Sequence, residues 1–370
     1  MSIRDSLFAL LPPAPRLLLR VLSVSGAATL ALLLPGPALA CAGFYHDEGS
    51  FAESNRQEAI FRILDGGVQV DYRVALDVNT PGFGWVIPVP GVVSKVEDGD
   101  DAEFEELETL TAPTRDLAES EGSGCNAYAL KSNAGGSGET RSDNGYTVVY
   151  SGSTPTYDYT VLEATSSDAL AAWLGENGWE LGATESSIEA YVAQGGFQFL
   201  AVKLHIDVDD GEAVAATLPP LRISHSGSSL IFPSRMAQFG DVEYLETRVY
   251  VVGEGRAHVS GWKEEELPLV WDDGEDPDYM LYSALPEAIG AIGREGAFAV
   301  TYSGEWQGAW VTRFDTTADR MLHTVDAVFT VGTDKTELQT MVSNQGGCRA
   351  PEGASWLWVP LLGLLRRKDD

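Results

Sequence analysis

The sequence predicts an α+β fold that is dominated by β-structure, with mostly antiparallel sheets and a few short helices. The main observation is a strict alternation of apolar and polar side chains over 68–78, which indicates a strand with one buried face. Further runs rich in Val, Tyr, Phe and Thr bring the total to about ten strands. Hydrophobic residues make up 44% of the 370 residues, which is enough to build a core.

Two strands form the first predicted hairpin. The run 58–64 leads into a turn at 65–67, and the alternating strand 68–78 follows. The next segment, FGWVIPVP, contains Pro88 and Pro90, which cannot donate to a ladder, so it is expected at a sheet edge or as an extended rim. The side chains expected on the buried face of the hairpin are Val68, Val70, Tyr72, Val74, Leu76 and Val78, and those on the other face are Gln69, Asp71, Arg73, Ala75 and Asp77.

Three short helices are expected between the strands. The first covers 103–110 and places Phe104 and Leu107 on one face. The second and third each begin with capping-box spacing and end at a glycine. Their start and stop signals are Thr165 with Asp168, Asn177 with Gly178, Ser186 with Glu189, and Gly195 with Gly196.

Later strands and the composition suggest how the chain is divided. Strands are expected over 146–150, 157–165, 197–206, 246–255, 298–302, 309–314 and 325–331. The expected parts are a signal peptide (1–40), a main α+β domain (41–260) that contains a flexible loop (118–145), a β-rich part (261–335) that is either a second domain or part of the first, a polar stalk (336–353) and a sorting tail (354–370).

The N-terminus has the features of a signal peptide. Three arginines precede or flank an apolar stretch over 21–34, and Ala38-Leu39-Ala40 forms a small-x-small cleavage site. Cleavage after Ala40 makes Cys41 the first mature residue. A lipoprotein signal would place a larger apolar residue at position 38, so ordinary signal peptidase is the expected partner.

The C-terminus has the features of a sorting tail. The apolar run 354–365 is shorter than the roughly 20 residues of a membrane span and is followed by Arg366, Arg367 and Lys368. With Cys348 ahead of the run, the tail resembles the tripartite sorting tails of exported bacterial proteins, most closely the myxobacterial type. The resemblance implies processing at Cys348 by an envelope sorting protease and delivery to the cell surface. A C-terminal helix docked in the core is the alternative.

Three cysteines leave the disulfide state open. Export permits disulfides, and Cys41 with Cys125 is the natural pair because Cys348 lies in the tail. Two free thiols are the alternative. A catalytic role for the Cys125 thiol is a weaker hypothesis than its participation in a disulfide.

Charge and motifs exclude several classes of function. The formal net charge of −31 repels phosphate backbones, which argues against nucleic-acid binding. No HExxH zinc motif, GxSxG elbow or Walker motif is present, so no reaction is indicated. The histidines are isolated in the sequence at His46, His205, His225, His258 and His323, with His225 expected in a loop.

Acidic clusters offer one candidate metal site. The densest cluster holds Asp272, Asp273, Asp276 and Asp278 around Pro277, and calcium binds several oxygen ligands from such a bending loop. The spacing differs from that of an EF-hand loop, and a solvated turn is the alternative. No other cofactor is expected.

Several blocks resemble one bacterial family. CAGFY, the hairpin running into FGWVIPVP, YTVLEATSSDALAAWLGENGWEL, EAYVAQGGFQFLAVKL and WVTRFDT are similar to the family called domain of unknown function 2330. The family usually has a second cysteine near its start, where this chain has His46. The resemblance implies an exported protein and carries no assigned activity.

These observations predict an exported cell-envelope or cell-surface protein of a Gram-negative bacterium, held transiently in the membrane by its tail. It is expected to bind or scaffold through an unknown surface ligand rather than to catalyse a reaction. Two alternatives remain. One is an exported hydrolase whose site is assembled from scattered His, Asp and Glu residues, and the other is a calcium-stabilised surface adhesion protein.

Overall fold

The computed structural model confirms the predicted fold class. In the described residues, four α-helices accompany 22 strands, more than the ten expected, and most strand pairs are antiparallel. All described elements belong to one of two compact units, Pro37–Asp370, whereas the other, Met1–Gly36, lies outside the described residues. The structure describes residues 44–45, 52–78, 84–116, 141–143, 145–179, 185–204, 214–239, 242–271 and 277–343.

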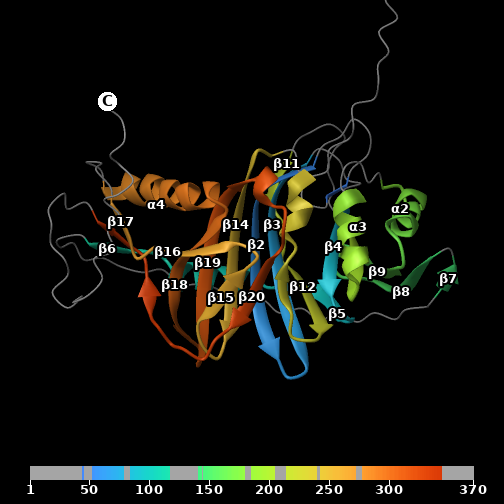
Figure 1. Cartoon of the computed structure of the whole chain (residues 1–370), viewed down its shortest axis with the longest axis horizontal. Coiled ribbons are helices and arrows are strands. Elements are labelled where there is room, and N and C mark those ends of the chain that lie inside the picture. Colours follow the sequence, from blue (N-terminus) through green and yellow to red (C-terminus); the bar gives the residue numbers. More distant parts are fainter. Residues whose placement is uncertain are drawn as a thin grey trace, which may run out of the picture. The chain divides into compact units, whose positions relative to one another are not determined.

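A ten-stranded sheet is the largest element (Figure 1). Its strands run in the order β16-β18-β19-β14-β2-β3-β12-β5, with β11 beside β3 and β21 beside β18. The bounds are β16 (Lys263–Glu266), β18 (Ala297–Trp306), β19 (Ala309–Asp319), β14 (Tyr244–Gly253), β2 (Ala52–Leu64), β3 (Gly67–Val78), β12 (Leu221–Ser226), β5 (Val93–Asp98), β11 (Val214–Thr217) and β21 (Leu338–Gln339). Since β14 and β19 pair over ten residues, strands from both sides of position 260 share this sheet.

Three further sheets complete the β-structure. A six-stranded sheet has the order β1-β4-β10-β9-β8-β7, and two three-stranded sheets have the orders β13-β20-β15 and β17-β22-β6. The bounds are β1 (Phe44–Tyr45), β4 (Gly84–Pro90), β10 (Phe197–Leu204), β9 (Tyr157–Ala164), β8 (Tyr146–Ser153), β7 (Arg141–Asp143), β13 (Leu230–Phe232), β20 (Ala327–Val331), β15 (Ala257–Ser260), β17 (Leu269–Trp271), β22 (Met341–Ser343) and β6 (Thr114–Asp116).

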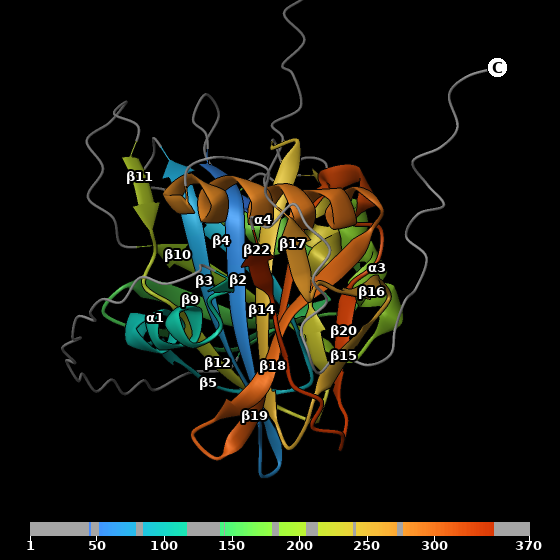
Figure 2. The same ribbon diagram turned by 90° about the vertical axis from the view of Figure 1, so that its left-hand side faces the viewer.

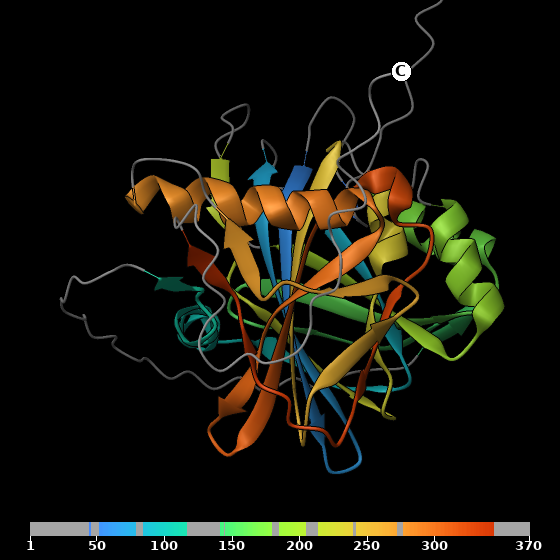
Figure 3. The same cartoon turned by 60° about the vertical axis from the view of Figure 1, so that its left-hand side comes forward.

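The helices cover the outer faces of the two large sheets. Apolar side chains of α2 (Ser167–Glu176) and α3 (Glu185–Gln194) pack on the six-stranded sheet. Those of α1 (Asp101–Leu110) and α4 (Pro277–Arg294) pack on the ten-stranded sheet (Figures 2 and 3). The inner faces of both sheets share one large apolar core, to which β13, β15 and β20 also contribute.

The predicted first hairpin is present, but its outer face is not solvated. Strands β2 and β3 pair across a turn in which Gly66 adopts a φ of 87°, a conformation that favours glycine. Val68, Val70, Tyr72 and Val74 are buried as expected. Of the residues expected on the other face, Asp71 and Arg73 are also buried. The prediction of one buried face was therefore wrong, because helices and charged partners cover the second face.

The proline-containing segment forms β4. This strand pairs with β10 along its whole length, whereas β1 pairs only with Gly84 and Trp85. Among the described residues, Pro88 and Pro90 thus have a neighbouring strand on one side only. This agrees with the expected edge position, because proline lacks the N–H that a second neighbour would need.

Helices α1, α2 and α3 lie where the sequence placed them, but two of the predicted N-terminal caps are displaced. Helix α3 begins at Glu185, so the predicted cap Ser186 lies within the helix. Phe104 and Leu107 of α1 are buried, as expected. The large apolar side chains buried on α2 are Leu170, Trp173 and Leu174, and those on α3 are Ile188 and Tyr191. The N-cap of α2 is Ser166 rather than Thr165, since the Ser166 hydroxyl accepts from the Ala169 N–H at 3.2 Å.

Helix α4, the longest, was not predicted. Pro286, Gly290 and Gly293 lie within or near its end and obscure the helical pattern. Position 293 requires a glycine, because a Cβ atom there would lie 2.2 Å from the Thr317 carbonyl oxygen of β19. The glycine therefore permits the close approach of α4 to the sheet.

Three other expectations need correction. The stalk was expected from position 336, yet Leu338–Gln339 forms β21 and Met341–Ser343 forms β22, which lies between β17 and β6 with parallel pairing. The loop 118–145 includes β7 at Arg141–Asp143, and its residues 118–140 lie outside the described part. His225, expected in a loop, is a buried residue of β12.

Candidate functional site

Most of the site residues predicted from the sequence lie outside the described residues. These are Ala40, Cys41, Cys125, Cys348, Asp272, Asp273 and Asp276. Asp278 lies in the first turn of α4, where the structure describes the backbone position only. The processing, disulfide and calcium predictions therefore stay predictions.

The three described histidines lie apart from one another. His225 is buried in β12, where burial lowers the pKa of its imidazole. His258 is half exposed beside Glu264, and His323 is buried edge-on against Trp262, with ring centroids 4.9 Å apart. Within the described ranges, no three His, Cys, Asp or Glu side chains come close enough to hold a metal ion.

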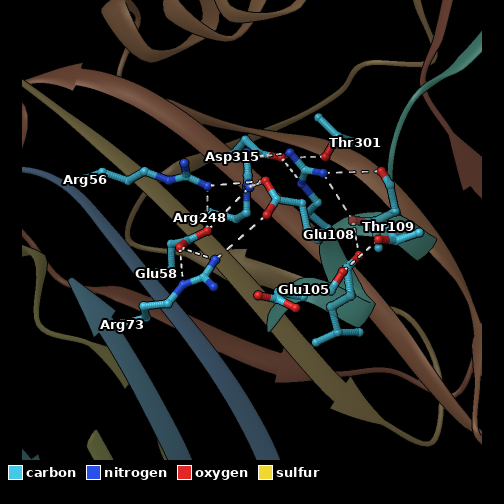
Figure 4. Close-up of polar contacts among 12 residues, drawn as sticks. Arg56, Glu58, Arg73, Glu105, Glu108, Thr109, Arg248, Thr301 and Asp315 are labelled. Atoms are coloured by element: carbon cyan, nitrogen blue, oxygen red, sulfur yellow. Dashed lines mark hydrogen bonds and ion pairs between the residues drawn. The ribbon is translucent and has the colours of Figure 1, made fainter. Parts of the chain in front are cut away.

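Charged side chains instead meet on the outer face of the ten-stranded sheet (Figure 4). We call this group the arginine cluster. Its members come from four strands and from α1, and most of them are buried or half-buried. They are Arg56 and Glu58 of β2, Arg73 of β3, Glu108 of α1, Arg248 of β14, and Arg313 and Asp315 of β19.

Strand register places alternating charges in a row across the sheet. Asp315 lies opposite Arg248, Arg248 lies opposite Glu58, and Glu58 lies opposite Arg73. Positions directly opposite on neighbouring strands bring side chains within reach of each other. The sign therefore alternates over β19, β14, β2 and β3, and each charge has an opposite charge beside it.

The contacts along this row are short. Arg248 Nε lies 2.8 Å from Asp315 Oδ1, and Arg73 Nη2 lies 2.6 Å from Glu58 Oε2. Arg313 donates to both carboxylate oxygens of Asp315, from Nε at 2.7 Å and from Nη2 at 3.0 Å. The Thr301 hydroxyl also donates to Asp315 at 2.6 Å. Asp315 thus receives hydrogen bonds from three residues, as a buried carboxylate requires.

The surroundings fix the charge of these groups. Burial alone would raise the pKa of Asp315, but Arg313, Arg248 and the hydrogen bond from Thr301 hold it well below its usual range. Burial also opposes ionisation of Glu108, yet Arg248, Arg56 and Arg73 together lower its pKa. The pKa of Arg248 is raised far above its usual value, because the carboxylates around it outweigh its burial.

Helix α1 closes one end of the cluster. Phe104 and Leu107 pack on an apolar patch of the sheet that includes Tyr250, and the Arg73 guanidinium lies 4.4 Å from the centre of the Phe104 ring. The Trp306 indole N–H, at the tip of the β18–β19 hairpin, donates to Glu106 at 2.8 Å. Asp101 and Glu103 lie in the first turn of α1, where the helix dipole favours negative charge, whereas no basic residue lies in its last turn. Glu108, near the C-terminal end, is paired instead with arginines of the sheet.

A second ion-pair group lies further along the same helix. We call it the Asp71 cluster, and it consists of Arg62, Asp71, Glu103 and Arg222. Asp71 is 1% exposed and is bound by both arginines. Glu103 of α1 lies 2.8 Å from Arg62 and 2.6 Å from Arg222, so α1 bridges the two clusters.

A cavity of about 320 Å³ adjoins the arginine cluster, between the sheet, α1 and α4. Its polar wall includes Arg56, Arg248, Arg313, Glu108, Glu246 and Asp315. Its apolar wall is formed by Leu285, Pro286 and Ile289 of α4. The Asp71 cluster contributes no residue to its lining.

Comparison with known proteins identifies the family. The family described as an uncharacterized protein conserved in bacteria, DUF2330, matches residues 35–302. The chain belongs to this family. The match includes Arg56, Glu58, Arg73, Glu108 and Arg248 of the arginine cluster, whereas Arg313 and Asp315 lie beyond it.

Other comparisons add no function to this DUF2330 member. No curated protein matches the chain significantly. A crystal structure of baculovirus P35 aligns with a TM-score of 0.34 and 9% sequence identity, covering 79% of this chain and 98% of that one. At that level the similarity supports no inference about the chain. None of the described helices is long and apolar enough to span a membrane.

Sequence reasoning named no member of the arginine cluster as a site residue. A signal was present, since charged residues recur at alternate positions of strongly apolar strands, as in WVTRFDT of β19. Alternation alone assigns such residues to a solvated face. The sequence of this DUF2330 chain does not reveal that α1 and α4 cover that face.

Proposed function

We propose that the chain is an exported protein of the cell envelope or cell surface that binds or scaffolds and does not catalyse a reaction. The observation that carries the binding role is the fixed charge of the arginine cluster. General acid–base catalysis works best with groups whose pKa lies near the working pH. The pKa values of Asp315 and Glu108 are lowered and that of Arg248 is raised, so these groups keep their charge at neutral pH. Such a site suits recognition of charge better than proton transfer.

Export is supported by the two ends of the sequence. Residues 1–40 have the composition of a signal peptide, and Cys348 precedes a short apolar run and a basic group. Signal peptidase and an envelope sorting protease would be the processing partners. Strand β22 ends at Ser343, so a cut at Cys348 would leave every described element on the mature protein.

Mass spectrometry of the terminal peptides tests the location. The protein would be recovered from the membrane and medium fractions of its native host. We expect an N-terminus at Cys41 and a C-terminus at or just before a modified Cys348. An intact Met1 and Asp370 on protein found in the cytoplasm would contradict export and sorting.

A substrate panel tests the non-catalytic role. The same purified protein would be incubated with chromogenic esters, peptides and glycosides. We expect no turnover above that of a heat-denatured sample. Turnover that co-purifies with the protein and is lost in an Asp315→Asn variant of retained secondary structure would support the hydrolase alternative instead.

A further inference from the structure

The cavity beside the arginine cluster has one charged wall and one apolar wall. We propose that it binds a small monocarboxylate with an apolar body, an inference that rests on the binding role proposed above. The carboxylate would lie against Arg56 and Arg248, and the apolar body would lie against α4. With a volume of about 320 Å³, the cavity is at the lower end of the size range of small-molecule sites.

Two arginines on the charged wall have donors to spare. Arg56 Nη2 and Arg248 Nη1 converge on Glu108 Oε1, at 3.5 and 3.0 Å (Figure 4). Within the described ranges, Arg56 Nε and Nη1 and Arg248 Nη2 make no hydrogen bond. Guanidinium groups bind carboxylates through paired N–H donors in a fixed plane. A ligand carboxylate can therefore use the donors that the cluster leaves over.

The balance of charge on the cavity wall favours a singly charged anion over a doubly charged one. Its lining contains three arginines and three carboxylates, and the latter are Glu108, Glu246 and Asp315. A divalent phosphate would place its second charge near these carboxylates, where repulsion opposes binding. The chain as a whole has a net charge of −31, which further disfavours highly charged anions.

The apolar wall gives the ligand its second feature. Leu285 and Ile289 are 8% and 7% exposed and face the cavity from α4, with Pro286 between them. Burial of an alkyl group against such a surface is favourable in proportion to the area removed from water. A carboxylate with a short alkyl or similar apolar body fits both walls, whereas acetate would use only one.

Calorimetric titration with acetate, butyrate, hexanoate and inorganic phosphate tests this proposal on the exported protein. We expect affinity to rise by about fourfold for each added methylene, from the usual value of a buried CH₂ group. Phosphate should bind more weakly than hexanoate. Equal affinity for all four anions, or no binding of hexanoate, would overturn the proposal.

A pair of variants separates the cavity from general effects on the charged face. Arg56→Gln removes a cavity donor, and we expect roughly tenfold weaker binding of hexanoate, as for a lost charged hydrogen bond. Arg62→Gln is the matched control, since Arg62 lies on the same face of β2 and pairs with one sheet carboxylate and one α1 carboxylate. It should bind hexanoate as the parent does. Equal losses in both variants would contradict a site at Arg56.

Ile289→Ala tests the apolar wall. This variant should retain binding of acetate and lose most of the gain from acetate to hexanoate. Comparison of unfolding midpoints in urea shows whether each variant is folded. If folded Ile289→Ala protein showed the same increase in affinity with the length of the ligand's alkyl chain as the parent does, α4 would be excluded as the apolar contact.

The two proposals can fail separately. If terminal peptides show processing at both ends but no carboxylate binds, only the ligand assignment is wrong. If hexanoate binds as expected to a protein that stays unprocessed in the cytoplasm, the proposed location is wrong and the cavity assignment stands.

Discussion

Phe314 and Asp315 are neighbours on β19, yet they lie on opposite faces of the ten-stranded sheet and are stabilised by different means. Phe314 is fully buried in the apolar core that the two large sheets share. Asp315 is 4% exposed on the other face, among Arg248, Arg313 and Thr301. Both faces are thus inside the protein, although one is apolar and the other is charged.

The two faces depend on strand register in different ways. An apolar face gains free energy from buried area and tolerates small shifts of its neighbours. A buried charged face is favourable only when each charge has its partner at the correct distance. The alternating row from Asp315 to Arg73 meets this condition because the registers of three strand pairs agree. We therefore expect the charged face to add specificity to the alignment of the strands, and the apolar face to contribute more of the stability.

Substitutions of these two neighbours should produce the largest effects. Asp315→Asn leaves Arg313 and Arg248 without a full counter-charge, and we expect a loss of about 3–5 kcal/mol in the free energy of unfolding. Phe314→Ala creates a cavity in the core, with an expected loss of about 3–5 kcal/mol. Urea unfolding at pH 7 measures both. A loss below about 1 kcal/mol for Asp315→Asn would show that the charged face is not tightly coupled.

The pH then separates the two faces. Because the pKa of Asp315 is lowered on folding, its contribution to stability is present above about pH 4 and is lost as the pH falls below that value. The effect of Asp315→Asn should therefore shrink in acid, whereas that of Phe314→Ala should stay constant. An effect of Asp315→Asn that is as large at pH 2 as at pH 7 would contradict this assignment.

A buried histidine makes the apolar side sensitive to milder acid. Burial lowers the pKa of His323 to about 4, and the Ala318 backbone and the charge of Asp319 offset this only in part. Between pH 6.5 and pH 4 the unfolded chain binds a proton that the folded chain does not, so stability falls as the pH falls. The full effect reaches about 3 kcal/mol. His323→Phe keeps a ring beside Trp262 and should flatten the curve of unfolding free energy over this interval.

The control for that prediction is a histidine of a different environment. His258 is half exposed beside Glu264 and Asp334, and His258→Phe controls for the replacement of a histidine by phenylalanine at a site away from Trp262. If both variants retained the parent slope, the acid sensitivity would have to come from other groups.

Much of the fold follows from local patterns in the sequence. The turn at Gly66, the alternation of β3 and the apolar positions of α1 each involve residues close together in the chain. Periodicity and capping therefore predicted these elements correctly. The same patterns predicted one apolar face of the hairpin, because Val68, Val70, Tyr72 and Val74 occupy alternate positions of β3.

The arginine cluster could not be predicted in this way. Arg248 and Glu58 are 190 residues apart, and Arg313 and Thr111 are 202 residues apart. Local sequence patterns do not identify such pairs. A polar residue in a predicted strand is assigned to the solvent-exposed face unless the element that packs over that face is known. The glycines and the proline of α4 interrupt the pattern that would predict a helix. Strand β22 is short and pairs in parallel with strands that are distant in the sequence. These features depend on tertiary contacts.

The smallest expected effect lies at the border between the charged face and solvent. Glu108 binds Arg248 at 3.0 Å, but its side chain is 49% exposed. Water and salt screen such a pair, so Glu108→Gln should cost about 1 kcal/mol or less at low salt. In 0.5 M NaCl the difference from the parent should nearly vanish, while the loss caused by Asp315→Asn should persist because buried pairs are screened much less. Urea unfolding at two salt concentrations measures both. If Glu108→Gln and Asp315→Asn responded equally to salt, burial would not set the strength of ion pairs on this face, and the distinction between its inner row and its rim would be lost.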